Sequence, residues 1–257
     1  MKKKLTLKEI EEKLHTIEER NHPFLKEIKH DERKGAQKLL DRWYKNLEFR
    51  SLAAEKFYEM TALERKLRQE GFSLIAGIDE AGRGPLVGPV VAAAVILPED
   101  FSLIGINDSK KLTAKQRGEF FEKIKEQAVA VGVGIIGPRE IDAVNIFEAT
   151  KKAMLAAVNS LPVNPDFLLV DAVKLQTPYP AEAVIKGDSK SISIAAASII
   201  AKVTRDKIML ELDKEYPHYQ FARNMGYGTR EHIQAIEKYG ITPHHRKTFA
   251  PIKDFFN

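Results

Sequence analysis

The sequence predicts an α/β protein: a mixed five-stranded sheet flanked by helices, preceded by a small all-helical N-terminal domain. Residues 1–70 contain one glycine, one proline and no valine, and their apolar residues recur at helical spacing. Beyond residue 71, short apolar runs bounded by turn residues alternate with helical stretches, which is typical of α/β folds. We therefore expect a helical extension in residues 1–71 and a larger domain in residues 72–257.

Length and composition set the outer limits. The chain has 257 residues, and its apolar content of 44% is sufficient for a sizeable core. No apolar run approaches the roughly 18 residues of a membrane span, and no signal-peptide pattern is present. Because the chain has no cysteine, it forms no disulfide, thiolate metal site or cysteine nucleophile. These features predict a cytoplasmic protein.

The net charge of +5 is unevenly distributed along the chain. Residues 1–70 hold 18 Lys and Arg against 14 Asp and Glu, whereas the rest of the chain is nearly balanced. A solvated helical surface is the ordinary interpretation of such charges. The alternative is a basic accessory domain that binds the backbone of a nucleic-acid duplex and adds salt-sensitive affinity.

The N-terminal segment is expected to form a small bundle of at least three helices. Thr6 and Glu9 have the spacing of a capping box, and so do Thr61 and Glu64. Another helix is expected to start near Asp31. Its predicted apolar face carries Leu39, Leu40, Trp43 and Leu47.

Three apolar runs, residues 74–78, 90–97 and 129–136, predict successive strands. A wide turn rich in glycine and proline joins the first two strands. A helix at residues 114–128 is expected before the third. Strands that follow one another through turns favour an antiparallel meander.

Two further strands are expected after one or two helices in residues 138–161. The run 167–170 ends in Asp171, and a weaker run at 183–185 ends near Asp188. The helical crossover favours a fourth strand parallel to the first. A largely apolar helix at residues 191–212, capped by Ser191 or Ser193, should be buried against the sheet, and residues 230–239 predict a last helix.

Four acidic residues, Asp79, Glu80, Asp171 and Asp188, stand at or just beyond the ends of apolar runs. Taken singly, each aspartate is an ordinary turn residue. Parallel neighbouring strands would bring Asp79 and Asp171 together, where carboxylates favour Mg²⁺ or Mn²⁺. Two such ions about 3.5–4 Å apart hydrolyse phosphodiesters. The pattern therefore predicts metal-assisted phosphodiester hydrolysis.

Asp79 and Glu80 are consecutive, so a regular strand would point their side chains to opposite faces. Both bind metal only if the strand breaks at Glu80. The Ala81-Gly82 sequence that follows favours such a break.

The stretch GIDEAGRGPLVGPVVAAAVIL, residues 77–97, closely resembles the signature of the ribonuclease HII family, enzymes that cut the RNA part of RNA–DNA duplexes. VDA around Asp171 and KGDSKSISIAAASIIAKVTRD around Asp188 resemble its other acidic motifs. The likeness covers residues 72–257 and implies a ribonuclease H-like fold. It further implies that Asp79, Glu80 and Asp171 are the core metal ligands and that Asp188 completes the set toward a second ion.

The resemblance also implies a substrate site. The backbone of Gly82, Arg83 and Gly84 would sense the ribose 2′-hydroxyl, and Tyr227 would stack on the sugar at the RNA–DNA junction. Lys190, and Lys110 or Lys111, are candidates for phosphate contacts, although solvated lysines explain them equally well. The adjacent pair His244 and His245 is interpreted as structural or as contacting the backbone, because neighbouring residues do not present one ligand face.

Together these features predict an endonuclease that hydrolyses the RNA strand of RNA–DNA hybrids. It would also nick duplex DNA 5′ to a single ribonucleotide and leave 3′-hydroxyl and 5′-phosphate ends. The sister ribonuclease HIII enzymes carry a sheet-containing N-terminal domain, which the valine-free segment disfavours. Replication or repair proteins are possible partners, and no membrane is expected. The alternatives are a DNA resolvase or integrase-type nuclease on a related fold, and a non-catalytic hybrid binder.

Overall fold

The structure is a computed structural model that describes residues 4–107 and 109–256. The chain forms two compact units, Met1–Tyr58 and Glu59–Asn257. In the described part of the chain, no helix is long and apolar enough to span a membrane.

The first unit is helical, with α1 (Leu7–His15), α2 (Pro23–Lys29) and most of α3 (Lys34–Met60). The capping box at the start of α1 is confirmed, because the Glu9 amide donates to Thr6 Oγ1 at 3.2 Å and the Thr6 amide donates to Glu9 Oε2 at 2.7 Å. The helix expected near Asp31 begins at residue 34, and α2 precedes it. The three helices share one apolar core formed by Ile10, Leu14, Ile17, Phe24, Leu25, Ile28, Ala36 and Leu40.

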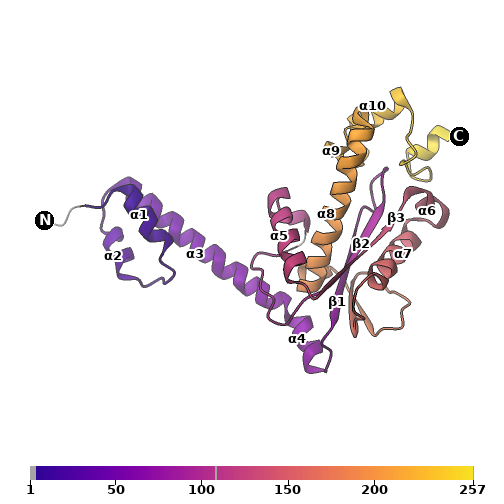
Figure 1. Ribbon diagram of the computed structural model, residues 1–257. Coiled ribbons are helices and arrows are strands. Elements are labelled where there is room, and N and C mark those ends of the chain that lie inside the picture. Colours follow the sequence, from indigo (N-terminus) through magenta and orange to yellow (C-terminus); the bar gives the residue numbers. More distant parts are fainter. Residues whose placement is uncertain (1–3, 108, 257) are drawn as a thin grey trace. The chain divides into compact units, whose positions relative to one another are not determined.

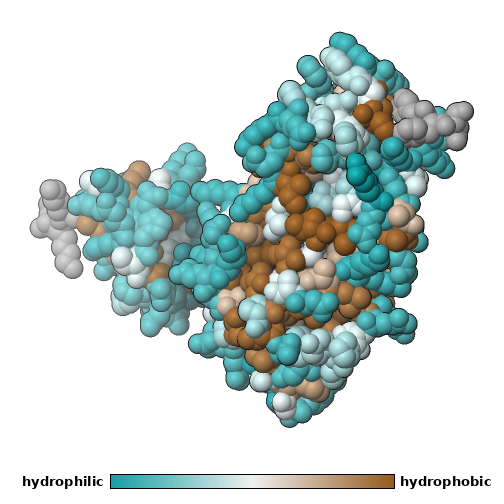
Figure 2. Space-filling model, turned by 45° about the vertical axis from the view of Figure 1, so that its right-hand side comes forward, coloured by the Kyte–Doolittle hydropathy of each residue, from teal (hydrophilic) through white to brown (hydrophobic). Residues whose placement is uncertain are grey.

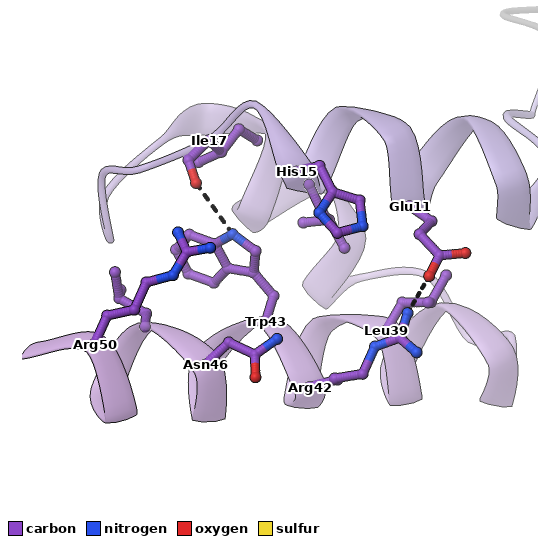
Figure 3. A pocket seen from close by; sticks show the side chains of 10 residues that line it. Glu11, His15, Ile17, Leu39, Arg42, Trp43, Asn46 and Arg50 are labelled. Carbon is purple, nitrogen blue, oxygen red and sulfur yellow. Dashed lines mark hydrogen bonds and ion pairs between the residues drawn. The ribbon is translucent and has the colours of Figure 1, made fainter. Parts of the chain in front are cut away.

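A small cavity of about 80 Å³ lies within this first unit, between α1 and α3 (Figure 3). Two polar contacts lie at this cavity: the Trp43 indole donates to the Ile17 carbonyl at 3.2 Å, and Arg42 pairs with Glu11. These bonds join the two helices, and we interpret the cavity as part of their packing.

The second unit includes α4 (Ala62–Gln69), which the sequence grouped with the N-terminal helices. The capping box expected at Thr61 and Glu64 is wrong. Thr61 has helical backbone angles and makes no side-chain cap bond. Glu64 is buried and accepts hydrogen bonds from the hydroxyls of Ser191 and Ser193 at 2.5 and 2.6 Å. The carboxylate that the local pattern assigned to the start of α4 therefore binds the amino end of another helix instead.

The predicted mixed sheet is confirmed, with strand order β3-β2-β1-β4-β5. β1 pairs antiparallel with β2, and β2 pairs antiparallel with β3, as in the expected meander. β4 lies parallel to β1, and β5 lies parallel to β4. The strands are β1 (Ile75–Ala81), β2 (Val90–Ile96), β3 (Ala130–Ile136), β4 (Phe167–Asp171) and β5 (Ala181–Val184).

Helices cover both faces of this sheet (Figure 1). The buried helix α8 (Ile192–Glu215), capped by Ser191, packs against β1 so closely that a Cβ on Gly77 would lie 2.0 Å from the backbone of Ser193. The helices α6 (Pro138–Val144) and α7 (Ile146–Asn159) lie on the opposite face. The remaining elements are η1 (Ser109–Lys111), α5 (Ala114–Gln127), η2 (Gly187–Ser189), η3 (Pro217–Tyr219), α9 (Phe221–Asn224), α10 (Arg230–Tyr239) and η4 (Ile252–Phe256).

Candidate active site

The parallel pairing of β1 and β4 brings the first two predicted acids together. Ile78 lies opposite Val170, so Asp79 and Asp171 follow at the same end of adjacent strands. Both residues lie on the face that packs against α8, because the alternate β1 residues Ile75 and Gly77 contact that helix. The carboxyl end of a parallel strand pair is the usual position of a site in such sheets.

The strand break expected at Glu80 is wrong. β1 stays paired through Ala81, and the chain leaves it at Gly82, where φ is +96°. Glu80 therefore alternates with Asp79 along β1. The acids nevertheless lie close enough to interact, because the charge of Glu80 raises the pKa of Asp79 and that of Asp171 raises the pKa of Glu80, so the proposal that both hold metal does not depend on a break in the strand.

The Asp79 carboxylate is 5% exposed. Burial raises its pKa well above the usual value, and the negative charges of Glu80 and Asp171 raise it further. Hydrogen bonds from Ser198 and from the Glu80 amide, the latter at 2.7 Å, oppose this effect. The side chain is thus a buried acid surrounded by like charges.

The Glu80 carboxylate is also largely buried, and burial raises its pKa. Arg83, whose Nη1 lies 3.4 Å from Oε1, opposes the shift, and Lys110 does so more weakly. The other oxygen, Oε2, is buried and has no hydrogen-bond partner among the described residues. Lys110 is therefore close enough to the acids to act on them electrostatically.

Asp171 is held by the turn that carries the fourth acid. The Gly187 amide donates to Asp171 Oδ1 at 2.6 Å, and a Cβ at Gly187 would lie 2.5 Å from a methyl of Ile194. Asp188 follows in η2 and is half-buried, while Lys190 is exposed at the end of that turn. The sheet and η2 thus bring all four acids to one end of the strands.

In residues 4–107 and 109–256, no three His, Cys, Asp or Glu side chains surround a common point as a formed metal site. The donor types do fit a hard divalent cation, because they are all carboxylate oxygens and Glu80 Oε2 is buried without a hydrogen bond in the described part of the chain.

Residues 82–89, hereafter the glycine loop, lie beside Tyr227. A Cβ on Gly84 would be 3.5 Å from Tyr227 Cε1, and the Leu86 amide donates to the Gly226 carbonyl at 2.8 Å. The Tyr227 side chain is 50% exposed. An aromatic ring is therefore available next to the Gly-Arg-Gly backbone.

Sequence reasoning missed the residues that support this loop from within. Arg205 and Arg246 are buried and bond its carbonyls. His245 accepts from the Thr242 amide at 2.9 Å, and its Nε2 lies 3.2 Å from Nε2 of His232. The structural interpretation of His245 is thus confirmed. Arg205 stands among other charged residues of α8, such as Lys202 and Asp206, so nothing in the local sequence marks it as buried.

Comparison with known proteins gives a consistent result. A family model described as Ribonuclease HII matches residues 76–252, and one described as Ribonuclease HII N-terminal domain matches residues 6–68. A relative named Ribonuclease HII from Bacillus cereus is 55% identical over 251 residues, 98% of each chain.

Solved structures agree with this match. The ribonuclease H2 of Pyrococcus horikoshii superposes with a TM-score of 0.61 at 31% identity, covering 70% of this chain and 95% of that one. The RNase HII of Archaeoglobus fulgidus, solved as a complex with PCNA, gives a TM-score of 0.60 at 27% identity, covering 68% and 95%.

Proposed function

The chain belongs to the ribonuclease HII family of RNase H-type endonucleases, which cleave RNA in RNA–DNA hybrids, and on that premise we propose a finer activity. We propose that it also nicks duplex DNA on the 5′ side of a single embedded ribonucleotide, leaving 3′-hydroxyl and 5′-phosphate ends. This proposal rests on one observation: the exposed Tyr227 ring lies beside Gly84. Gly84 belongs to the glycine loop, which directly follows the strand that carries Asp79 and Glu80.

The proposed catalytic residues are Asp79, Glu80, Asp171 and Asp188. They would hold Mg²⁺ or Mn²⁺, since hard oxygen donors favour these ions. A bound pair of such ions supplies an activated water and stabilises the leaving oxygen of the phosphodiester. The buried position of Asp79 excludes solvent from its carboxylate, and like charges around it favour binding of a cation.

The substrate-binding role belongs to Gly82, Arg83, Gly84 and Tyr227 in this proposal. Arg83 is exposed beside Glu80 and suits a phosphate of the cleaved strand. Tyr227 would stack on the sugar at the junction. Lys190 is a candidate for a phosphate contact, and so is Lys110, which acts on Glu80 electrostatically; both side chains are exposed.

For the first unit we propose a role as an accessory nucleic-acid-binding domain. One face of α3 carries the exposed side chains of Lys38, Lys45 and Lys56, spaced at helical intervals around Phe49, which is 71% exposed. Arg42 on the same side of the helix pairs with Glu11 of α1. The face of this unit that Figure 2 shows is mainly hydrophilic. Cations interleaved with an aromatic ring suit a polyanion with bases or sugars to contact. Acidic residues of α3 lie on a neighbouring face, at Asp41, Glu48 and Glu55.

A replication protein is a proposed partner, since the Archaeoglobus fulgidus relative was solved in a complex with PCNA.

The test of the proposed activity is cleavage of three end-labelled duplexes: all DNA, DNA with one ribonucleotide, and DNA with an RNA run. Each is incubated with Mg²⁺, Mn²⁺ or EDTA. We expect metal-dependent nicking 5′ to the single ribonucleotide, lost in Asp79→Asn. Cleavage of all-DNA duplex would favour a resolvase-type nuclease, and binding without any cleavage would favour a hybrid binder. Cleavage of the RNA run alone would contradict the role of Tyr227.

A further inference from the structure

Two arginines of the second unit are buried without an acidic partner. Arg205 and Arg246 are 1% and 0% exposed, and among the described residues they are the two largest fully buried side chains. Neither forms an ion pair with a described residue. A buried guanidinium is costly unless its donors are satisfied, so the groups that satisfy these two are informative.

Both arginines bond main-chain carbonyls. Arg246 donates to the carbonyls of Gly82 at 2.5 Å and Arg83 at 2.9 Å, and through Nε and Nη2 to that of Gly88 at 3.0 and 2.9 Å. Arg205 donates to three further carbonyls, those of Val87 at 3.0 Å, Pro89 at 3.1 Å and Met225 at 3.0 Å. Five of these six carbonyls belong to the glycine loop, and the sixth lies two residues before Tyr227.

This arrangement fixes where the loop amides point. The peptide bonds of the glycine loop are trans, and in a trans peptide the C=O and the following N–H point in opposite directions. Since Arg246 holds the carbonyls of Gly82 and Arg83 on the buried side, the amides of Arg83 and Gly84 must point away from it. Both residues are exposed, and neither amide donates a hydrogen bond to another described residue.

We propose that Arg246, supported by Arg205, is a positioning residue for ribose specificity: it orients the loop so that the Arg83 and Gly84 amides face the sugar. The inference rests on the proposed function, in which this loop senses the 2′-hydroxyl. Arg205 extends the same control to the stacking ring, because it joins Pro89 of the loop to Met225 beside the Gly226-Tyr227 turn.

Two further observations support the assignment. A Cβ on Gly82 would lie 2.2 Å from Arg205 Nε, so the loop backbone approaches the guanidinium as closely as glycine allows. Burial lowers the pKa of Arg246 to about 9, and the neighbouring charge of Arg205 adds to this, so the group remains protonated at neutral pH. Five fixed donors on a planar group match several carbonyls at once, which a lysine ammonium cannot do in the same geometry.

The test compares binding in the full chain carrying Asp79→Asn, which prevents cleavage. Fluorescence anisotropy measures affinity for a labelled duplex with one ribonucleotide and for the all-DNA duplex of the same sequence. We expect the parent to prefer the ribonucleotide, and Arg246→Lys to reduce that preference about fivefold to tenfold, the effect of one or two hydrogen bonds. Affinity for the DNA duplex should change less than twofold. Arg68→Lys is the matched control, since Arg68 donates to the Leu97 carbonyl outside the loop.

An unchanged preference in Arg246→Lys would overturn the inference, and so would an equal loss of affinity for both duplexes, which indicates a general structural role. If the Asp79→Asn parent itself shows no preference, the proposed 2′-hydroxyl sensing fails and this inference fails with it. If Arg246→Lys does not fold, hydrogen exchange of the loop amides is measured in the Asp79→Asn parent instead. The Arg83 and Gly84 amides should be protected by the ribonucleotide duplex and not by DNA, and equal protection would overturn the inference.

Discussion

The two units of this protein use charged side chains in opposite ways. In the first unit the charges lie at the surface, as in the Lys8 and Glu12 pair, whose side chains are 87% and 66% exposed and 4.0 Å apart. In the second unit Glu64, Asp79, Arg205 and Arg246 are buried. Exposed pairs contribute little to stability and remain available to a partner, whereas buried charges fix the geometry of whatever they bond.

Among the buried charges, we expect the largest change in activity when Asp79 is replaced. We expect Asp79→Asn to lower the cleavage rate by more than about 100-fold, because even residues that only support metal ligands cost 10–100-fold when changed. The unfolding temperature measured in EDTA should not fall, since the variant removes a charge that burial disfavours. Asp206→Asn, which removes a partner of Lys202 on α8, is the control for a general effect of lost charge. A destabilised Asp79→Asn would show that the carboxylate is structural.

A second effect is expected at Glu64, whose carboxylate joins α4 to the start of α8. Glu64→Ala should lower the free energy of unfolding by about 2–3 kcal/mol, because it leaves buried Ser191 and Ser193 donors without their acceptor. Urea denaturation measures this change. The matched surface variant Glu12→Ala should change stability by less than about 0.5 kcal/mol. Equal effects of the two variants would contradict the contrast between buried and exposed charges.

The buried histidines predict a pH dependence of stability. Burial lowers the pKa of His245 to about 4, and the neighbouring His232 and His244 add to the shift. The pKa of His232 is also lowered by burial. Below pH 6.5 the unfolded chain binds protons that the folded chain does not, so stability falls as the pH falls toward 4.

Between pH 7 and pH 5 we expect His245 to account for about 1–2 kcal/mol of lost stability. Urea unfolding at the two pH values measures it. His245→Asn should weaken the dependence, because it stays neutral. An identical pH dependence in the variant would show that other groups cause the loss.

The smallest effect is expected in the first unit. Replacing Lys38 and Lys45 with glutamine should leave stability within about 0.5 kcal/mol, because both side chains are exposed. The slope of log affinity against log salt should fall by about one per lost phosphate contact. Lys8→Gln with Lys26→Gln, on α1 and α2, is the matched control. An unchanged slope in the α3 variant would exclude that face from the proposed nucleic-acid surface.

The amino-acid pattern was sufficient to predict the sheet, the positions of its strands and the end of the sheet where the acids gather. These features depend on short-range patterns: apolar runs, turn residues after them, and a crossover long enough to make β4 parallel to β1. The Gly-Arg-Gly motif and the acidic motifs also identified the family, because each is a continuous stretch of sequence. The roles of Asp79, Glu80, Asp171 and Asp188 as metal ligands stay a prediction.

Which buried polar groups meet, in contrast, depends on the packing of the folded chain. Glu64 satisfies the local spacing of a capping box, yet it bonds Ser193, 129 residues away. Arg246 reaches the Gly88 carbonyl across 158 residues. A buried charge must find its partner wherever the packed chain provides one, because leaving it unpaired is too costly, and spacing along the sequence does not encode that partner.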